Sequence, residues 1–180
     1  MIRIFVTFPI SNPLSESLIE ISKSNSHLEK TRWTPKENLH ITLFFIGEVR
    51  ESTLEMILSN LQKVFSNQNT FSLEFDSIIF KGRKHPSMLW AMFKKNNLFS
   101  ELSQRIYESV KEFMTITPSH ADPIPHCTLA RLKPGSEISS FDNSINLSQS
   151  KIIINTAELW QTIQTKEGVR YKSLRIFSMN

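Results

Sequence analysis

Apolar residues recur along the chain with two different periods, and the order of these periods predicts the elements. Alternation at every second position is typical of strands, and spacing of three to four residues is typical of amphipathic helices. Strands are predicted over 2–8, 38–46, 70–80, 87–94, 125–132, 151–161 and 170–178, and helices over 13–26, 52–66 and 97–114. Helices therefore mix with strands that often follow one another directly. This order predicts an α+β fold with antiparallel sheet.

Local signals set the ends of these elements. Asn12 followed by proline predicts the start of the first helix, since asparagine caps helices and proline suits the first turn. Gly47 is predicted to end the second strand. Ser52 and Glu55 have the spacing of a capping box at the start of the second helix. The polar segment 134–150 is predicted to be a surface loop, and no linker divides residues 1–180 into separate domains.

Composition excludes several classes of protein. The chain has 180 residues, of which 39% are hydrophobic and 21% charged, so it can bury a core and is not disordered. No apolar stretch approaches the roughly 18 residues of a membrane span, and the first residues lack the pattern of a secretory signal. A single cysteine, Cys127, excludes an internal disulfide and a cysteine-based zinc site. We therefore expect a cytoplasmic protein without membrane contact.

The charge balance adds a weak indication of an anionic ligand. Lysine and arginine number 21 against 17 acidic residues, which gives a formal net charge of +4 and an isoelectric point near 9.3. Such a balance is compatible with RNA or phosphate as a ligand, although many basic proteins bind neither.

A short repeat carries the chemistry. Residues 40–43 read His-Ile-Thr-Leu, and residues 126–129 read His-Cys-Thr-Leu. Each lies on a predicted strand, where side chains two apart share a face. The histidine and threonine of each motif therefore face one way, while the other two residues face the core. If a pseudo-twofold relates the motifs, two imidazoles and two hydroxyls meet around one ligand.

That set of groups suits cleavage of a phosphodiester. Imidazole titrates near neutrality, so one histidine can accept a proton while the other donates one. The hydroxyls of Thr42 and Thr128 can donate to the non-bridging phosphate oxygens. A structural role for the histidines and zinc binding by His40 and His126 are the alternatives. The repeat argues against the first, and the lack of a third ligand in either motif argues against the second.

The sequence resembles the two-histidine phosphoesterase superfamily, and within it the RNA 2′,3′-cyclic phosphodiesterases, also called 2′-5′ RNA ligases. The resemblance extends over nearly the whole chain. Beyond the two motifs it rests on Arg3-Ile4-Phe5-Val6, Trp33, Glu37-Asn38-Leu39, Phe45-Ile46-Gly47, Gly82, Pro86, Leu89-Trp90, Ala130-Arg131, Glu158-Leu159-Trp160, Gly168 and Tyr171.

The resemblance implies a bilobal α+β fold, with an antiparallel sheet and flanking helices in each lobe and the site in the cleft between them. It implies hydrolysis of a terminal 2′,3′-cyclic phosphate on RNA to a 2′-phosphate, with reversible 2′-5′ ligation possible and with no metal or other cofactor. His40 is then the proton donor and His126 the proton acceptor, while Thr42 and Thr128 hold the phosphate. No obligate protein partner is implied.

Other residues are candidates for substrate contact. The resemblance assigns Arg131 to the substrate, but simple alternation turns it away from His126, so contact requires a bulge or a strand end. Arg3 and the basic run 81–84 are candidates for contact with the RNA backbone. Three aromatic residues are candidates for base stacking, namely Phe5, Phe44 and Tyr171.

Other functions remain open from the sequence. The same site could serve a 2′-5′ oligonucleotide phosphodiesterase or a phosphodiesterase of small cyclic nucleotides. A non-catalytic RNA-binding module is an alternative of another class, and a zinc hydrolase is a third. Retention of both histidines and both threonines argues against the binding module.

Overall fold

The computed structural model describes residues 1–10, 13–115, 123–166 and 168–180. The helices of this part of the chain are α1 (Leu14–Ser24), α2 (Leu54–Phe65) and α3 (Asn97–Val110). The strands are β1 (Ile2–Pro9), β2 (Thr31–Trp33), β3 (His40–Val49), β4 (Phe71–Lys81), β5 (Met88–Phe93), β6 (His126–Leu132), β7 (Lys151–Ile154), β8 (Thr156–Thr165) and β9 (Gly168–Ser178). None of the helices is long and apolar enough to cross a membrane.

Most predicted elements form close to their predicted positions, and the differences concern short segments and ends. The strand predicted over 151–161 is two strands, because β7 pairs with β4 whereas β8 pairs with β1 and β9. The three-residue strand β2 was not predicted, since so short a segment shows no period. β3 continues through Gly47, whose φ of +94° places it at a bulge opposite β1 and not at the strand end.

Two predicted helix starts are wrong or untested. A 3-10 turn over Glu51–Thr53 precedes α2, so Ser52 lies before the helix and the predicted capping box does not form. Asn12 lies outside the described residues, and Pro13 occupies the cap position of α1. By contrast, Asn96 caps α3 by accepting a hydrogen bond from the Phe99 amide at 3.1 Å.

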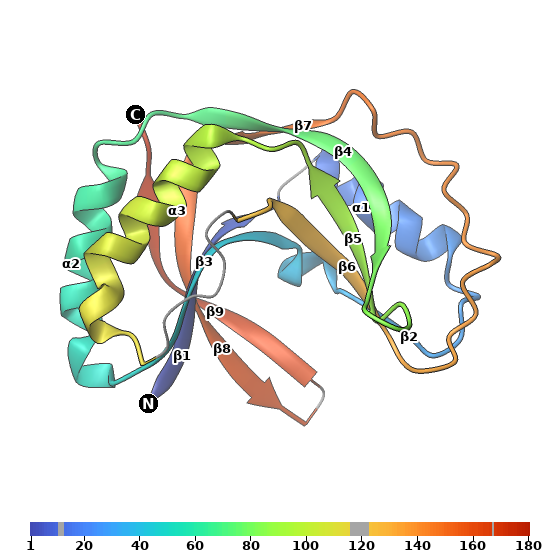
Figure 1. Ribbon diagram of the computed structural model, residues 1–180, viewed down its shortest axis with the longest axis horizontal. Helices are drawn as coiled ribbons and strands as arrows, with labels where there is room; N and C mark the ends of the chain where they lie inside the picture. Colours follow the sequence, from blue (N-terminus) through green and yellow to red (C-terminus); the bar gives the residue numbers. More distant parts are fainter. Residues whose placement is uncertain (11–12, 116–122, 167) are drawn as a thin grey trace.

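The strands form one curled antiparallel sheet in the order β7-β4-β5-β6-β3-β1-β8-β9, with β2 beside β6 (Figure 1). It has two halves, one made of β1, β3, β8 and β9 and the other of β4, β5, β6 and β7. The halves meet where β3 lies against β6, through the pair Ile41 and Cys127. The prediction of an α+β fold with antiparallel sheet is confirmed.

The core extends beneath both halves of the sheet. α2 and α3 pack against each other and against the half that holds β3 and β9, whereas Figure 1 shows α1 toward the other half. Ile41 and Cys127 are fully buried in this core. The histidine and threonine of each motif are only partly buried and face away from the core. The buried joint therefore fixes the two motif strands, while their polar side chains stay accessible.

Candidate active site

The two His-x-Thr-Leu motifs lie side by side at the joint between the halves of the sheet. Ile41 on β3 pairs with Cys127 on antiparallel β6. Continuing that register by one residue on each side brings His40 across from Thr128 and Thr42 across from His126. A local twofold through the Ile41–Cys127 pair thus relates the motifs, as their repeated sequence predicts.

Both imidazoles are held in the same way. Nδ1 of His40 donates to the carbonyl oxygen of Asn38 at 2.6 Å, and Nδ1 of His126 donates to that of Ile124 at 2.8 Å. A carbonyl oxygen can only accept a hydrogen bond, so Nδ1 carries the hydrogen in each ring. The other ring nitrogen, Nε2, is left to exchange a proton with a ligand.

Aromatic side chains surround His40. Its ring centroid lies 5.3 Å from that of Phe5, 5.2 Å from Trp160 and 5.1 Å from Tyr171. Burial in this cage lowers the pKa of His40 from 6.5 to about 4, because the apolar surroundings disfavour the charged imidazolium. The hydrogen bond to Asn38 opposes that shift, and the positive charges of His126 and Arg131 add to it.

His126 has a different neighbour. Its ring stacks on Trp90 with centroids 3.9 Å apart and an interplanar angle of 25°. The ammonium of Lys81 lies 5.6 Å from the centre of the same indole. The pKa of His126 is lowered, first by burial and then by the charge of Lys81, against the opposing effect of the bond to Ile124. Lys81 is thus the member of the basic run 81–84 that acts on the site.

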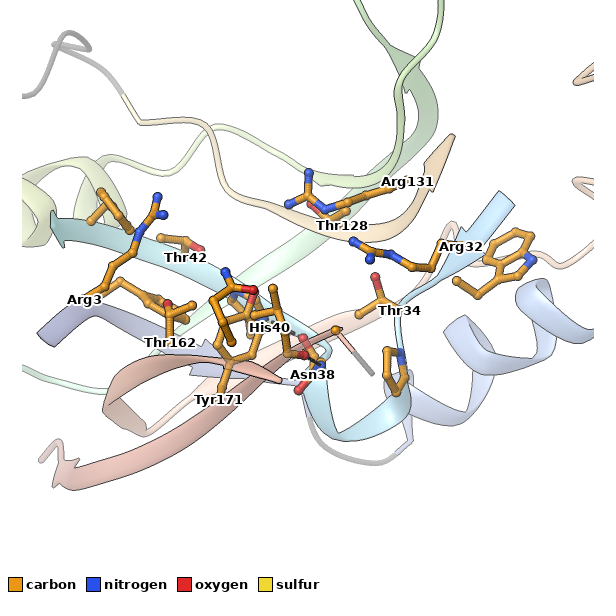
Figure 2. A pocket seen from close by; sticks show the side chains of 17 residues that line it. Arg3, Arg32, Thr34, Asn38, His40, Thr42, Thr128, Arg131, Thr162 and Tyr171 are labelled. Carbon is orange, nitrogen blue, oxygen red and sulfur yellow. Dashed lines mark hydrogen bonds between the residues drawn. The ribbon is translucent and has the colours of Figure 1, made fainter. Parts of the chain in front are cut away.

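A cavity of about 460 Å³ opens over the joint. Four of the five predicted site residues line it, namely His40, Thr42, Thr128 and Arg131, whereas His126 is not among its lining residues. In Figure 2 these four side chains come from β3 and β6 and face a common space, with the side chain of Tyr171 from β9 beside His40. The halves of the sheet thus share one cavity.

Bulges decide which residues beyond each motif reach the cavity. In β6 the pairing with β5 skips Leu129, so the alternation is broken and Arg131 turns onto the cavity side. In β3 the pairing with β1 skips Leu43, which is the equivalent position of the first motif. Phe45 therefore lines the cavity as the counterpart of Arg131.

This bulge overturns one predicted aromatic contact. Phe44 is buried in the core against Tyr107, and the exposed ring in the cavity is that of Phe45. Phe5 and Tyr171 do line the cavity. Simple alternation from His40 would put Phe44 on the polar face, and the extra residue at the bulge leaves no periodic signal in the sequence. The guanidinium of Arg3 covers Phe45, 4.9 Å from the ring centre.

Several lining residues come from segments with no motif. They belong to β2 and the segment after it and to the β8–β9 hairpin, and they are Arg32, Trp33, Thr34, Pro35, Asn38, Thr162, Gln164, Gly168 and Val169. Asn38 joins the two segments by donating to the carbonyl oxygen of Val169 at 3.2 Å. The described lining residues include three arginines and no carboxylate. The cavity therefore favours an anionic ligand.

Two other kinds of chemistry, metal binding and nucleophilic attack by Cys127, depend on the side chains present. The described residues include no group of three His, Cys, Asp or Glu side chains placed to hold a metal ion. Complete burial raises the pKa of the Cys127 thiol to about 12, so this cysteine is not a nucleophile near neutral pH. The site consists of two imidazoles, two hydroxyls and a basic rim.

Comparison with known proteins shows what the chain is similar to. Residues 8–90 match the model of the LigT-like phosphoesterases. An RNA 2′,3′-cyclic phosphodiesterase of Archaeoglobus fulgidus is 28% identical over 97% of this chain and 99% of its own. A Thermus thermophilus protein of known crystal structure aligns with a TM-score of 0.83 at 20% identity, over 98% of this chain and 97% of that one.

A second solved structure has the same fold. LigT of E. coli in its apo form aligns with a TM-score of 0.76 at 18% identity, over 99% of this chain and 98% of that one. The resemblance to the two-histidine phosphoesterases that the sequence predicts is confirmed.

Proposed function

We propose that this chain, a LigT-like phosphoesterase, is an RNA 2′,3′-cyclic phosphodiesterase that opens a terminal cyclic phosphate to a 2′-phosphate. The observation that carries the proposal is the meeting of two histidine–threonine motifs at one joint of the sheet, through the pairing of Ile41 with Cys127, beneath a cavity lined by His40, Thr42 and Thr128. The name of the A. fulgidus relative agrees with it.

The arrangement supplies each group that the reaction needs. The cyclic phosphate lies over the joint, with Thr42 and Thr128 donating hydrogen bonds to its non-bridging oxygens. Nε2 of His126 takes a proton from water as the water oxygen attacks phosphorus. The bond from phosphorus to the 3′ oxygen breaks, and Nε2 of His40 gives that oxygen its proton. Water is consumed, and the proton taken up by His126 returns to His40 through solvent.

The aromatic cage around His40 suits a proton donor. In the free protein the imidazole is neutral near pH 7, since burial holds its pKa at about 4. A bound phosphate places a negative charge beside the ring and favours the imidazolium. The proton is then held in apolar surroundings that strengthen its transfer to the leaving oxygen. No metal or cofactor takes part in this scheme.

The proposal also covers the domain organisation, the role of Arg131, the location of the enzyme and its partners. Residues 1–180 act as one bilobal domain, since the cavity draws on both halves of the sheet. Arg131 contacts the substrate from the rim. We expect the enzyme to act in the cytoplasm on RNA ends that carry cyclic phosphates and to need no obligate protein partner.

Single substitutions test the proposal. A short RNA that ends in a 2′,3′-cyclic phosphate is incubated in EDTA with the wild type, His40→Ala, His126→Ala or His85→Ala. Each general acid–base group contributes roughly 10²–10⁴-fold, so the first two variants are expected to lose at least about a hundredfold in kcat. His85 is exposed in the 81–86 loop, and its variant is the matched control that keeps full activity.

The same assay separates the other functions. Masses of the products distinguish opening of the cyclic phosphate from cleavage of a 2′-5′ linkage. Loss of activity in EDTA would indicate a metal hydrolase. If His40→Ala and His126→Ala turn over as fast as His85→Ala, with all variants folded by circular dichroism, this site is not catalytic.

A further inference from the structure

Two arginines lie opposite each other at one end of the cavity. Arg32 on β2 pairs directly with Arg131 on the neighbouring β6. Like charges at opposite positions of neighbouring strands repel each other and destabilise the pair. Both residues are exposed and line the same cavity as Thr128. Figure 2 shows their side chains reaching in the same direction, with Thr128 beside Arg131 and Thr34 beside Arg32.

No acidic side chain among the described residues balances this pair. The described ion pairs involve neither arginine, and none of the described lining residues is Asp or Glu. The guanidinium of Arg131 donates a weak hydrogen bond to the sulfur of Met88, at 3.7 Å. An unbalanced cationic pair in a cavity is the arrangement that guanidinium groups adopt to bind phosphate.

Arg32 lies further from the two motifs than Arg131 does. β2 and β3 both pair with β6, and β5 occupies its other edge. Arg32 lies opposite Arg131 and Ile41 opposite Cys127, so the two pairs are four residues apart along β6, roughly 13 Å. The Nη1 atom of Arg32 lies 3.9 Å from the point where a Cβ on Gly168 would be, at the start of β9. Arg32 therefore borders both the C-terminal end of β6 and the start of β9 in the β8–β9 hairpin. An anion bound here is next to the group held by Thr42 and Thr128.

We infer that Arg32 and Arg131 bind a second phosphate, the one on the 5′ side of the terminal nucleoside. This inference rests on the proposed function and narrows its substrate class. The enzyme selects oligonucleotides with a cyclic phosphate over mononucleoside 2′,3′-cyclic phosphates, which lack the second phosphate.

The test compares two substrates on three proteins. kcat/KM is measured for adenosine 2′,3′-cyclic phosphate and for a trinucleotide that ends in the same group, with the wild type, Arg32→Met and Arg50→Met. Arg50 is an exposed arginine beyond the far end of β3 and does not line the cavity. Methionine keeps the length of the side chain and removes its charge.

Arg32→Met is expected to lower the preference for the trinucleotide by about tenfold or more, mainly through KM, because hydrogen bonds between charged groups are the strong ones. The slope of log(kcat/KM) against log salt for the trinucleotide also falls by about 0.7. Arg50→Met keeps the wild-type preference.

An unchanged preference in Arg32→Met, within twofold of wild type, overturns the inference and leaves the proposed function standing. Equal losses on both substrates overturn it as well, since Arg32 then acts on the cyclic phosphate itself. If the wild type opens neither substrate, the proposed function fails and the inference fails with it.

Discussion

The two imidazoles share one hydrogen-bond pattern but titrate in different surroundings, and this governs how activity depends on pH. In the proposed mechanism, turnover requires one ring charged and the other neutral. The pKa of His40 is about 4 and that of His126 is below 6.5 in the free protein. Below both values no base is present, and above both no acid is present. We therefore expect kcat/KM, which reports the free enzyme, to peak between about pH 4 and 6.5.

The profile is measured with adenosine 2′,3′-cyclic phosphate, whose single negative charge is constant over this range. Activity is expected to fall about tenfold per pH unit on the alkaline side, as the charged imidazole is lost. A plateau of kcat/KM that extends to pH 8 would contradict the lowered pKa values.

At the scale of single residues, the sequence predicts the two histidine–threonine motifs but not the residues around them. The spacing of His40 and Thr42, repeated at His126 and Thr128, is enough to place four groups at one site. Phe45 and Arg32 escape prediction because a bulge and a three-residue strand bring them to the cavity. Neither feature leaves a periodic trace in the sequence.

At the scale of elements, the long loop 133–150 is tied to α1 by one buried side chain. Asn25 is fully buried. Its amide donates to the carbonyl oxygens of Ile21 at 2.9 Å and Asp142 at 2.8 Å, and its side-chain oxygen accepts from the amide of Asp142 at 2.7 Å. Removal of this side chain leaves buried polar groups without partners.

Asn25→Ala is therefore expected to lower the free energy of unfolding by about 2–4 kcal/mol, as measured by urea denaturation. The matched control is Asn67→Ala, an exposed asparagine bonded to the carbonyl oxygen of Lys63; its effect should stay within about 0.5 kcal/mol. A loss equal to that of the control would show that Asn25 does not anchor the loop.

The predicted elements are correct where the apolar period extends over many residues. They are incomplete where the partner strand sets the ends of a strand. The three α-helices of the described residues are all predicted, whereas the segment 151–161 is predicted as one strand. Its division at Asn155 depends on β7 pairing with β4 and β8 pairing with β1, which are contacts between distant segments. Local spacing carries no information on such partners.

For the whole molecule, the two halves of the sheet meet at the residue pair Ile41–Cys127, and the chemistry lies over that joint. The sequence repeat predicts the relation between the motifs. It does not predict that C-terminal β8 and β9 complete the half begun by β1, or that their hairpin, which projects from the sheet in Figure 1, walls the cavity. In the proposed mechanism, that arrangement places the reacting bond between the halves.

The most direct test of this account follows the oxygen atom of the attacking water. An RNA with a terminal 2′,3′-cyclic phosphate is incubated in H₂¹⁸O and EDTA with the wild type or with His40→Ala/His126→Ala, and the new terminus is mapped by mass spectrometry. The account predicts a 2′-phosphate that carries one ¹⁸O atom, formed by the wild type and not by the double variant. A 3′-phosphate, or equal opening by both proteins, would contradict it.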